Sequence, residues 1–310
     1  MPKIVVIGSY VVDLMSRAPH LPKPGETVLG GPFKMGPGGK GGNQATAAVR
    51  CGSNVTFVTR LGDDVFGREA LEHFRRERVN TQYIKHDKDE ATGAALISVD
   101  QQSENSIVVA LGACGKISEG DVLEAEAEIK EADIVLLQLE TSIEAVVASV
   151  RLSAKHGVPV ILNPAPFQKF SKEILKDVSY ITPNETEAHE LTGVEVIDEH
   201  SALIAAKKLY ELGVKNVIIT LGKQGAFLYT GGEKGKLIPG FTVDAIDTTG
   251  AGDAFNGGFA HAVASGKSIT DAMIFGNCVA ALSVTKIGTA PAMPIKTEID
   301  EFLKHNGVLI

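Results

Sequence analysis

The segment Asp247-Thr-Thr-Gly-Ala-Gly-Asp253-Ala-Phe-Asn-Gly-Gly joins a loop of small residues to a helical stretch that starts near Asp253. Backbone N–H groups at such a helix start form an anion site, and glycines let a phosphate approach closely. Asp253 lies beside that anion, where its carboxylate can accept a proton from an attacking hydroxyl. A glycine-rich loop with Asp as a helix cap is the structural alternative. The complete string is much more specific than an isolated Gly-x-Gly, so it predicts a phosphate site with a catalytic carboxylate.

Outward from this segment, short apolar runs alternate with stretches of helical period. Nearly all-apolar runs suit parallel strands covered on both faces, and they occupy residues 3–8, 55–59, 133–137, 158–162 and 217–220. Helices are predicted at residues 42–50, 67–78, 118–130, 143–156, 201–212, 254–265, 269–285 and 296–305. This alternation predicts an α/β fold with a doubly wound, mainly parallel sheet flanked by helices.

Two segments interrupt the alternation, at residues 11–34 and 92–111. Both combine alternating apolar and polar residues with turn signals, which predicts antiparallel hairpins inserted into a single domain that spans residues 1–310. A small sheet built from two such insertions can cover a site as a lid. Ordinary excursions at the sheet edge are the alternative, and the pattern alone leaves both open.

Composition excludes several classes of function. The 310-residue chain has a net charge of −8 and no cluster of Lys and Arg, so nucleic acid is an unexpected partner. Three scattered cysteines, Cys51, Cys114 and Cys278, form neither a disulfide framework nor a zinc site, and indicate a reducing compartment. The opening residues have no leader character and the apolar runs are too short to span a bilayer. We expect a cytoplasmic protein with no membrane partner.

Two further segments accompany the first: Gly-Pro-Gly-Gly-Lys-Gly-Gly-Asn-Gln-Ala at residues 36–45 and Thr-Pro-Asn-Glu-Thr-Glu at residues 182–187. With residues 247–255, they resemble the signatures of the ribokinase (PfkB) family of carbohydrate kinases, over essentially the whole chain. The resemblance is closest to the ribokinase and deoxyribokinase branches. It implies a mainly parallel sheet between helices, with a small β-sheet lid that often forms a homodimer contact. It also implies ATP-dependent phosphorylation of D-ribose at the 5-hydroxyl.

The resemblance also implies roles for individual residues in the sugar site. Asp253 matches the catalytic base, and the backbone at Gly250, Ala251 and Gly252 matches the anion hole. The sugar positions match Val11, Val12, Asp13, Gly39, Lys40, Gly41, Gly42, Asn43 and Glu140, together with Asp253 itself. Carboxylates and amides suit vicinal hydroxyls as acceptor and donor pairs. Taken alone, either Asp13 or Asn43 is more typical of a turn residue or a helix cap than of a sugar site.

The implied nucleotide site binds ATP without a P-loop, because no Gly-x-x-x-x-Gly-Lys-[Ser/Thr] string is present. Its matching positions are Asn184, Thr220, Leu221, Gly222, Lys223, Gln224, Gly225, Gly252 and Asn277. Glu187 matches the carboxylate that organises Mg²⁺ through its waters. Asn184 and Glu187 also have the spacing of a helix-capping box, which is a strong alternative for this pair.

The resemblance further implies a monovalent-cation site for K⁺ beside the anion hole. Its matching positions, mostly backbone oxygens, are Asp247, Thr249, Ser283, Lys286, Gly288 and Ala292. Asp247 is the one convincing side-chain ligand. Ala292 replaces a common serine, so a weaker site is expected.

One departure from the family pattern bears on the substrate. Val11 stands where ribokinases commonly have Asn, and an apolar residue there resembles deoxyribokinase. The alternatives are therefore a 2-deoxyribose kinase or another sugar kinase of the family. Two smaller departures are Asn277 in place of His and Cys114 in place of Asn. A non-catalytic sugar sensor is a further alternative, against which the intact Asp253 and its loop argue.

Overall fold

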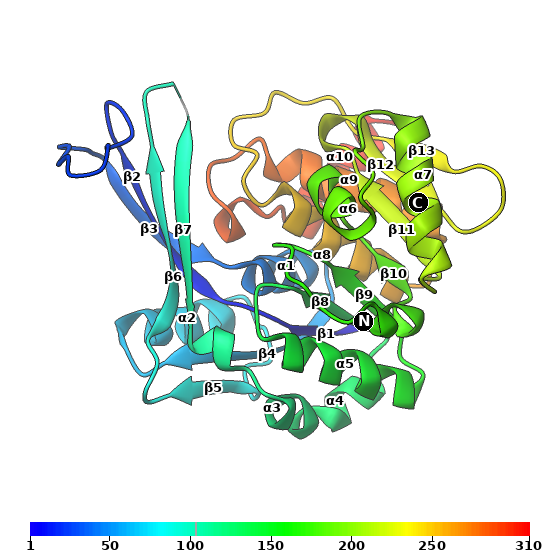
Figure 1. Cartoon of the computed structure of the whole chain (residues 1–310), viewed down its shortest axis with the longest axis horizontal. Coiled ribbons are helices and arrows are strands. Elements are labelled where there is room, and N and C mark those ends of the chain that lie inside the picture. Colours follow the sequence, from blue (N-terminus) through cyan, green and yellow to red (C-terminus); the bar gives the residue numbers. More distant parts are fainter. Residues whose placement is uncertain (103) are drawn as a thin grey trace.

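The computed structural model describes residues 1–102 and 104–310; Ser103, inside the predicted insertion at 92–111, lies outside them. A nine-stranded sheet forms the body, and a separate four-stranded sheet rises from one end of it (Figure 1). The large sheet has the order β13-β12-β11-β10-β9-β8-β1-β4-β5. Its strands are β1 (Lys3–Ile7), β4 (Asn54–Gly62), β5 (Ile84–Asp87), β8 (Ile134–Gln138), β9 (Val160–Asn163), β10 (Tyr180–Ile181), β11 (Asn216–Thr220), β12 (Gly225–Tyr229) and β13 (Lys236–Pro239).

Pairing in the large sheet is parallel from β5 to β11, and β12 and β13 add an antiparallel edge. Helices cover both faces, so the predicted doubly wound α/β fold is confirmed. Alternate residues of β1 enter two separate apolar clusters: Ile4 and Val6 pack on one face, and Val5 and Ile7 on the other. This two-sided burial explains why the strand sequences are continuously apolar.

The face of Ile4 and Val6 is covered by α1 (Lys40–Arg50), α2 (Val65–Arg76), α8 (Ala251–Ala264), α9 (Ile269–Ser283) and α10 (Lys296–His305). The opposite face is covered by α3 (Glu119–Glu124), α4 (Glu126–Glu131), α5 (Ile143–His156), α6 (Glu185–Thr192) and α7 (Glu199–Glu211). Single turns of 3₁₀-helix connect several elements: η1 (Ala113–Lys116), η2 (Lys172–Asp177), η3 (Gly222–Gln224) and η4 (Ala290–Ala292). Within the residues that the structure describes, no helix is both long and apolar enough to cross a membrane.

One predicted helix is divided into two in the structure, whereas the ends of several others differ from the prediction by two or three residues. Residues 118–130 form two short helices, α3 and α4, which meet at Ala125. The Ala125 backbone leaves the helical region (φ −87°, ψ 8°), and its N–H donates to Val122 O in a tightened last turn. The apolar periodicity continues across this break because both helices pack on the same sheet face, so the pattern alone could not reveal it.

The small sheet has the order β3-β2-β6-β7, with β2 (Val11–Arg17), β3 (Phe33–Gly38), β6 (Thr92–Val99) and β7 (Asn105–Gly112). Antiparallel pairing joins β2 with β3 and β6 with β7, so a hairpin lies at each predicted segment. The first hairpin extends to Gly38, beyond the predicted end at residue 34. Parallel pairing of β2 with β6 joins the two distant segments into one sheet. Strand β2 follows β1 after only a short turn, so the small sheet is anchored next to the centre of the large one.

Candidate functional site

Asp253 lies in the first turn of α8, where the chain turns sharply into the helix. Gly250 is the N-cap and adopts a left-handed backbone (φ 78°), which glycine tolerates without strain. The Ala251 N–H donates to Thr248 O at 3.2 Å, whereas the N–H groups of Gly252 and Asp253 have no acceptor among the described residues. Of the predicted anion hole at 250–252, the N–H groups of Gly250 and Gly252 therefore remain without an acceptor among the described residues, and the Asp253 N–H joins them.

Two amides hold the Asp253 carboxylate, which is only 6% exposed. Asn43 Nδ2 donates to Asp253 Oδ2 at 2.9 Å, and Gln44 Nε2 donates to Oδ1 at 2.9 Å. Asn43 Oδ1 is buried without a hydrogen-bond partner among the described residues. An unpaired acceptor next to a fixed carboxylate is costly to bury and suits a ligand hydroxyl as its donor.

Asp13 and Lys40 bring opposite charges to the same region. Thr289 donates to Asp13 Oδ2 at 3.0 Å. Burial raises the pKa of Asp13 to about 6 against this hydrogen bond, and the nearby charges of Glu140 and Asp253 raise it further. Burial opposes the charge of Lys40, but Asp253, Glu140 and Glu187 outweigh it and raise its pKa. The charges of three carboxylates thus favour the charged form of Lys40, which can balance an incoming anion.

Glu140 follows β8 and is buried beneath the start of α1. It accepts the Lys40 N–H at 2.8 Å and the Ser9 hydroxyl on the same oxygen. A carboxylate at a helix N-terminus stabilises that terminus through the helix dipole. Glu140 therefore fixes the glycine-rich start of α1, and Ser9 is a partner that the sequence did not reveal. Gly41 and Gly42 lie in the same turn, packed against Ser9 and Phe74, and Gly39 is the N-cap with φ 80°.

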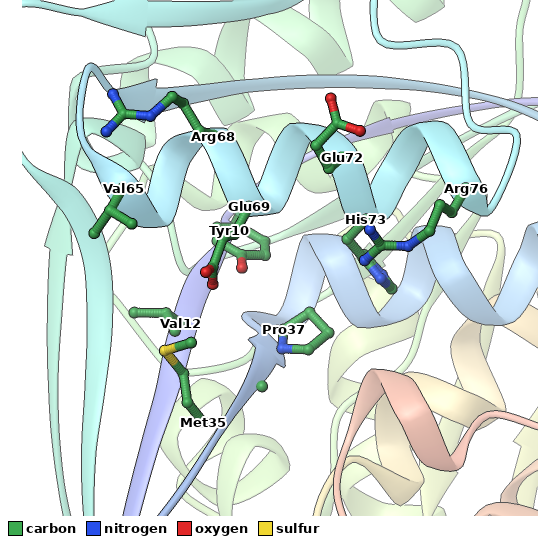
Figure 2. Close-up of a pocket in the computed structure, with 11 residues that line it drawn as sticks. Tyr10, Val12, Met35, Pro37, Val65, Arg68, Glu69, Glu72, His73 and Arg76 are labelled. Atoms are coloured by element: carbon green, nitrogen blue, oxygen red, sulfur yellow. The ribbon is translucent and has the colours of Figure 1, made fainter.

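Val11 and Val12 point to opposite faces of β2. Val11 shares a face with Asp13, as alternate strand residues do, and is 2% exposed. The side chain of Val12 instead lines a separate cavity of about 530 Å³ between the small sheet and α2 (Figure 2). Tyr10, Met35 and Arg76 also line this cavity. The structure therefore does not bring the Val12 side chain to Asp253, which corrects its expected place in the sugar site.

A second cavity of about 480 Å³ lies on the other side of the 250–252 turn. Seven predicted nucleotide positions line it: Asn184, Thr220, Gly222, Lys223, Gly225, Gly252 and Asn277. Leu221 and Gln224 do not; Leu221 is buried in the core and the Gln224 N–H donates to Leu221 O. These two predicted contacts are absent from the cavity wall.

Sequence reasoning missed the apolar wall of this cavity, which includes Val243, Ala245, Phe255, Ala280 and Val284. A mostly apolar wall with a few polar groups suits a flat heterocyclic base. Asn277, Ala280 and Ala281 of α9, and Val284 at its C-cap, line the cavity at helical spacing. That periodicity was the available signal. Asn277 itself donates to Ile238 O and Pro239 O, and so joins α9 to the end of β13.

Glu187 forms the capping box that its spacing allows. Both of its carboxylate oxygens accept from Asn184, one from the backbone N–H at 2.9 Å and one from Nδ2 at 3.1 Å. Burial raises the pKa of Glu187 against the effect of the Asn184 N–H. In the part of the chain that the structure describes, no cluster of three His, Cys, Asp or Glu residues could hold a metal directly. Glu187 is one carboxylate with spare lone pairs, which fits a metal bound through water.

Asp247 joins the loop before α8 to the loop after α9. Its carboxylate accepts the N–H groups of Thr249 and Gly288, both at 3.0 Å. Burial opposes these bonds, but they outweigh it and lower the pKa of Asp247. Ser283, at the end of α9, donates to Ala280 O, the Lys286 side chain pairs with Glu298, and Ala292 is buried in η4. Of the predicted cation-site side chains other than Asp247, those of Ser283 and Lys286 thus have partners of their own.

Known proteins match this chain over nearly its whole length. The family model described as pfkB family carbohydrate kinase matches residues 1–296. A ribokinase of Haemophilus influenzae is 46% identical over 97% of this chain and 98% of its own. A deoxyribokinase of Salmonella typhi is 37% identical over 98% and 99%.

Solved structures give the same result for the fold. The Arabidopsis thaliana ribokinase complexed with ribose and ATP is 33% identical, with a TM-score of 0.91, over 98% of this chain and 99% of its own. The Thermotoga maritima ribokinase is 36% identical, with a TM-score of 0.89, over 98% and 100%. The Asp253 site, the adjoining cavity and these full-length matches establish that the chain belongs to the pfkB family of carbohydrate kinases.

Proposed function

We propose that this chain is a ribokinase, which transfers the γ-phosphoryl group of ATP to the 5-hydroxyl of D-ribose. One observation carries the proposal: Asn43 and Gln44 fix the Asp253 carboxylate in the first turn of α8, directly after Ala251 and Gly252, which line the partly apolar cavity of about 480 Å³. An acceptor sugar and a nucleotide would meet at that carboxylate. Full-length similarity to ribokinases, at 46% and 42% identity, supports ribose as the sugar.

In this proposal Asp253 accepts the proton of the sugar hydroxyl as the hydroxyl attacks the γ-phosphorus. The open N–H groups of Gly252 and Asp253 stabilise the charge on the transferred phosphoryl group. Phosphoryl transfer requires little further covalent chemistry from a protein, so positioning dominates the catalytic effect. Asp13 and Asn43 bind sugar hydroxyls, the Gly39 and Lys40 region closes over them, and Lys40 offsets the negative charge of the bound phosphates.

We assign ATP to the 480 Å³ cavity, where Thr220, Gly222 and Gly225 form one wall. Glu187 is a single buried carboxylate, which suits Mg²⁺ bound through water molecules. Bound Mg²⁺ would neutralise charge on the phosphates. The loops joined by Asp247 fit K⁺ through backbone oxygens. By fixing those loops, Asp247 holds the Thr249 and Gly250 turn that precedes the anion hole.

We assign the role of lid to the small sheet. Asp13 on β2 belongs to the sugar site, and residues paired across strands share its face, among them Ala95 on β6 and Val109 on β7. Movement of this sheet over the sugar would exclude water and suppress ATP hydrolysis.

The opposite face of the small sheet supports a homodimer. Phe33, Met35, Leu96 and Val108 lie on that face and are 46–65% exposed. Exposed apolar side chains grouped on one sheet face are typical of protein–protein interfaces. We propose that a second copy covers this face, and that the protein works in the cytoplasm, where its three free, buried cysteines would stay reduced.

A second candidate substrate is 2-deoxyribose. Val11 lies on the face of Asp13 and offers no hydrogen bond to a 2-hydroxyl. We expect ribose to be accepted and 2-deoxyribose to be discriminated only weakly, by about 10-fold in kcat/KM, because little is left unpaired when the hydroxyl is missing.

The test is ADP release with ATP and a panel of D-ribose, 2-deoxyribose, D-fructose and a nucleoside, with the product identified by NMR. Ribose should give the highest kcat/KM and ribose 5-phosphate as product. Asp253→Asn is the matched control, and we expect it to bind ATP normally but to lose about 10²–10⁴-fold in kcat. Sugar-independent ADP release, or a higher kcat/KM for another sugar, would contradict the proposal.

A further inference from the structure

Three buried amide side chains form a hydrogen-bonded network with Asp253, and Gln44 is the residue that joins the other two to the Asp253 carboxylate. Gln138 Nε2 donates to Gln44 Oε1 at 2.7 Å. Gln44 Nε2 donates both to Asp253 Oδ1 at 2.9 Å and to Asn163 Oδ1 at 3.0 Å. Gln44 and Gln138 are wholly buried, and Asn163 is 6% exposed. These side chains come from α1, β8 and β9, which are distant in sequence.

The orientation of every amide in this network follows from one backbone carbonyl. Asn163 Nδ2 donates to Thr182 O at 3.1 Å, and a carbonyl oxygen can only accept. Asn163 must therefore present its oxygen to Gln44, and Gln44 must present its NH₂ group. The second hydrogen of that NH₂ group points at Asp253. Gln44 has no freedom to flip, because its own oxygen is held by Gln138.

The same hydrogen-bonded network also reaches the turn that carries the anion hole. Thr182 Oγ1 donates to Asn256 Oδ1 at 2.7 Å, and Asn256 Nδ2 donates to Gly252 O at 2.8 Å. The carboxylate of Asp253 and the carbonyl of Gly252 are thus tied to the same buried network. Gln138 Oε1, at the far end of the network, has no partner among the described residues, but every polar atom of Gln44 is paired. Paired polar groups in a low-dielectric interior are rigid and favour one arrangement.

We propose that Gln44 is a positioning residue for the transfer reaction: it fixes the Asp253 carboxylate at the angle from which it accepts the sugar proton. This inference rests on the proposed function, in which Asp253 is the base. Asn43 holds the other carboxylate oxygen and also offers an acceptor to the sugar, whereas Gln44 has no exposed atom. Gln44 therefore acts on turnover through Asp253 and not on sugar or ATP binding.

The test compares Gln44→Met with Thr46→Val, a control in the same helix. Thr46 is also fully buried, and its hydroxyl donates to Gly42 O at 2.8 Å, away from Asp253. Loss of a hydrogen bond to a charged group should lower kcat of Gln44→Met by about 10–100-fold, with both KM values within about threefold. Thr46→Val should stay within about twofold of wild-type kcat. The assays use whichever sugar gives the highest wild-type kcat. If that sugar is not ribose, the proposed substrate is wrong, but the role of Gln44 is still tested.

A double-mutant cycle with Asp253→Asn decides the mechanism. If Gln44 acts through the carboxylate, Gln44→Met should lower kcat by less than about twofold further in the Asp253→Asn background. An equal loss in both backgrounds, an unchanged kcat, or a rise in KM without loss of kcat would overturn the proposal.

If Gln44→Met does not fold, Gln44→Glu provides a second test of the proposal. Its carboxyl group can donate to Asp253 only while protonated, so kcat should fall as pH rises, opposite to a wild-type enzyme that uses a general base. The other charged groups facing Asp253 are Asp13, Glu140, Glu187 and Lys40, and they are common to both proteins. A wild-type pH profile in Gln44→Glu would overturn the proposal.

Discussion

Asp13 combines burial with a role in the proposed sugar site. Burial raises its pKa to about 6 against the Thr289 hydrogen bond, and Glu140 and Asp253 add to the rise. Below that pH the protonated carboxyl is a poorer acceptor for a sugar hydroxyl. We predict that kcat/KM for ribose falls as pH drops through about 6 in assays from pH 5 to 8. Asp13→Asn should lower kcat/KM throughout and remove this step; a step of unchanged position in the variant would contradict the assignment.

The same pKa has a consequence for stability. In the unfolded chain Asp13 ionises near 3.8, but in the folded protein it keeps its proton to about 6. The unfolded state therefore binds fewer protons between these values, and the contribution of Asp13 to stability falls as pH rises from about 4 to 6. We predict that Asp13→Asn raises the Tm of the ligand-free enzyme by about 2–6 °C at pH 8 but not at pH 4. Calorimetry at both pH values checks this, and an equal shift at both would exclude the ionisation as its cause.

Val11 provides the test of sugar preference. It is buried on the face of Asp13, so Asn at this position would present an amide to the sugar site. We predict that Val11→Asn shifts the kcat/KM ratio toward ribose over 2-deoxyribose by about 10-fold or more, because the amide is left unpaired by the deoxy sugar. Both sugars are measured in both proteins. An unchanged ratio would show that Val11 does not contact the 2-position.

Among individual residues, the sequence identified those that belong to a contiguous, specific motif. Asp253, Asn43 and the 250–252 turn fall in two glycine-rich strings and could be predicted. The roles of Gln44 and Thr289 could not. Gln44 lies in one of these strings, but neither its contact with Asp253 nor that of Thr289 with Asp13 is visible in the sequence, because the partners are distant in the chain. An amide or hydroxyl in a core helix or loop gives no sign of its partner until the fold brings the two together.

Among the elements, the loops on either side of Asp247 depend most on a single side chain. Asp247 accepts the N–H groups of Thr249 and Gly288, and these loops carry the proposed K⁺ ligands. We predict that replacing K⁺ by Na⁺ or Li⁺ lowers kcat, and that Asp247→Ala abolishes this difference. Initial rates in the three chloride salts at equal ionic strength check the prediction. Equal wild-type rates in all three would contradict the cation site.

Some helices and strands could be predicted from the sequence and others could not. The long parallel strands and amphipathic helices were predicted because two-sided burial makes them apolar or periodic. Strand β10 has only Tyr180–Ile181, and β12 and β13 form an edge of the sheet, so none of the three gave a clear pattern. The break at Ala125 was missed because periodicity reports the buried face and not helix continuity.

The whole molecule presents one strongly apolar surface on the small sheet. We predict a wild-type dimer by sedimentation equilibrium, and dissociation when Met35→Glu and Val108→Glu are combined, because buried like charges without partners are costly. Leu29→Glu is the control, because Leu29 is 90% exposed in the loop between β2 and β3, outside the paired rows of the sheet. A monomeric wild-type protein, or an unchanged mass for the double variant, would contradict the proposed interface.

The small sheet is a single layer, with Asp13 on one face and Met35 on the other. If sugar binding orders this layer from one side and a second copy orders it from the other, the two events share one cost in conformational entropy. Thermodynamic reciprocity then requires that sugar strengthens association by the same factor by which association strengthens sugar affinity. The apparent affinity of this enzyme for its sugar then depends on the enzyme concentration, and dilution alone would raise the apparent Kd for the sugar.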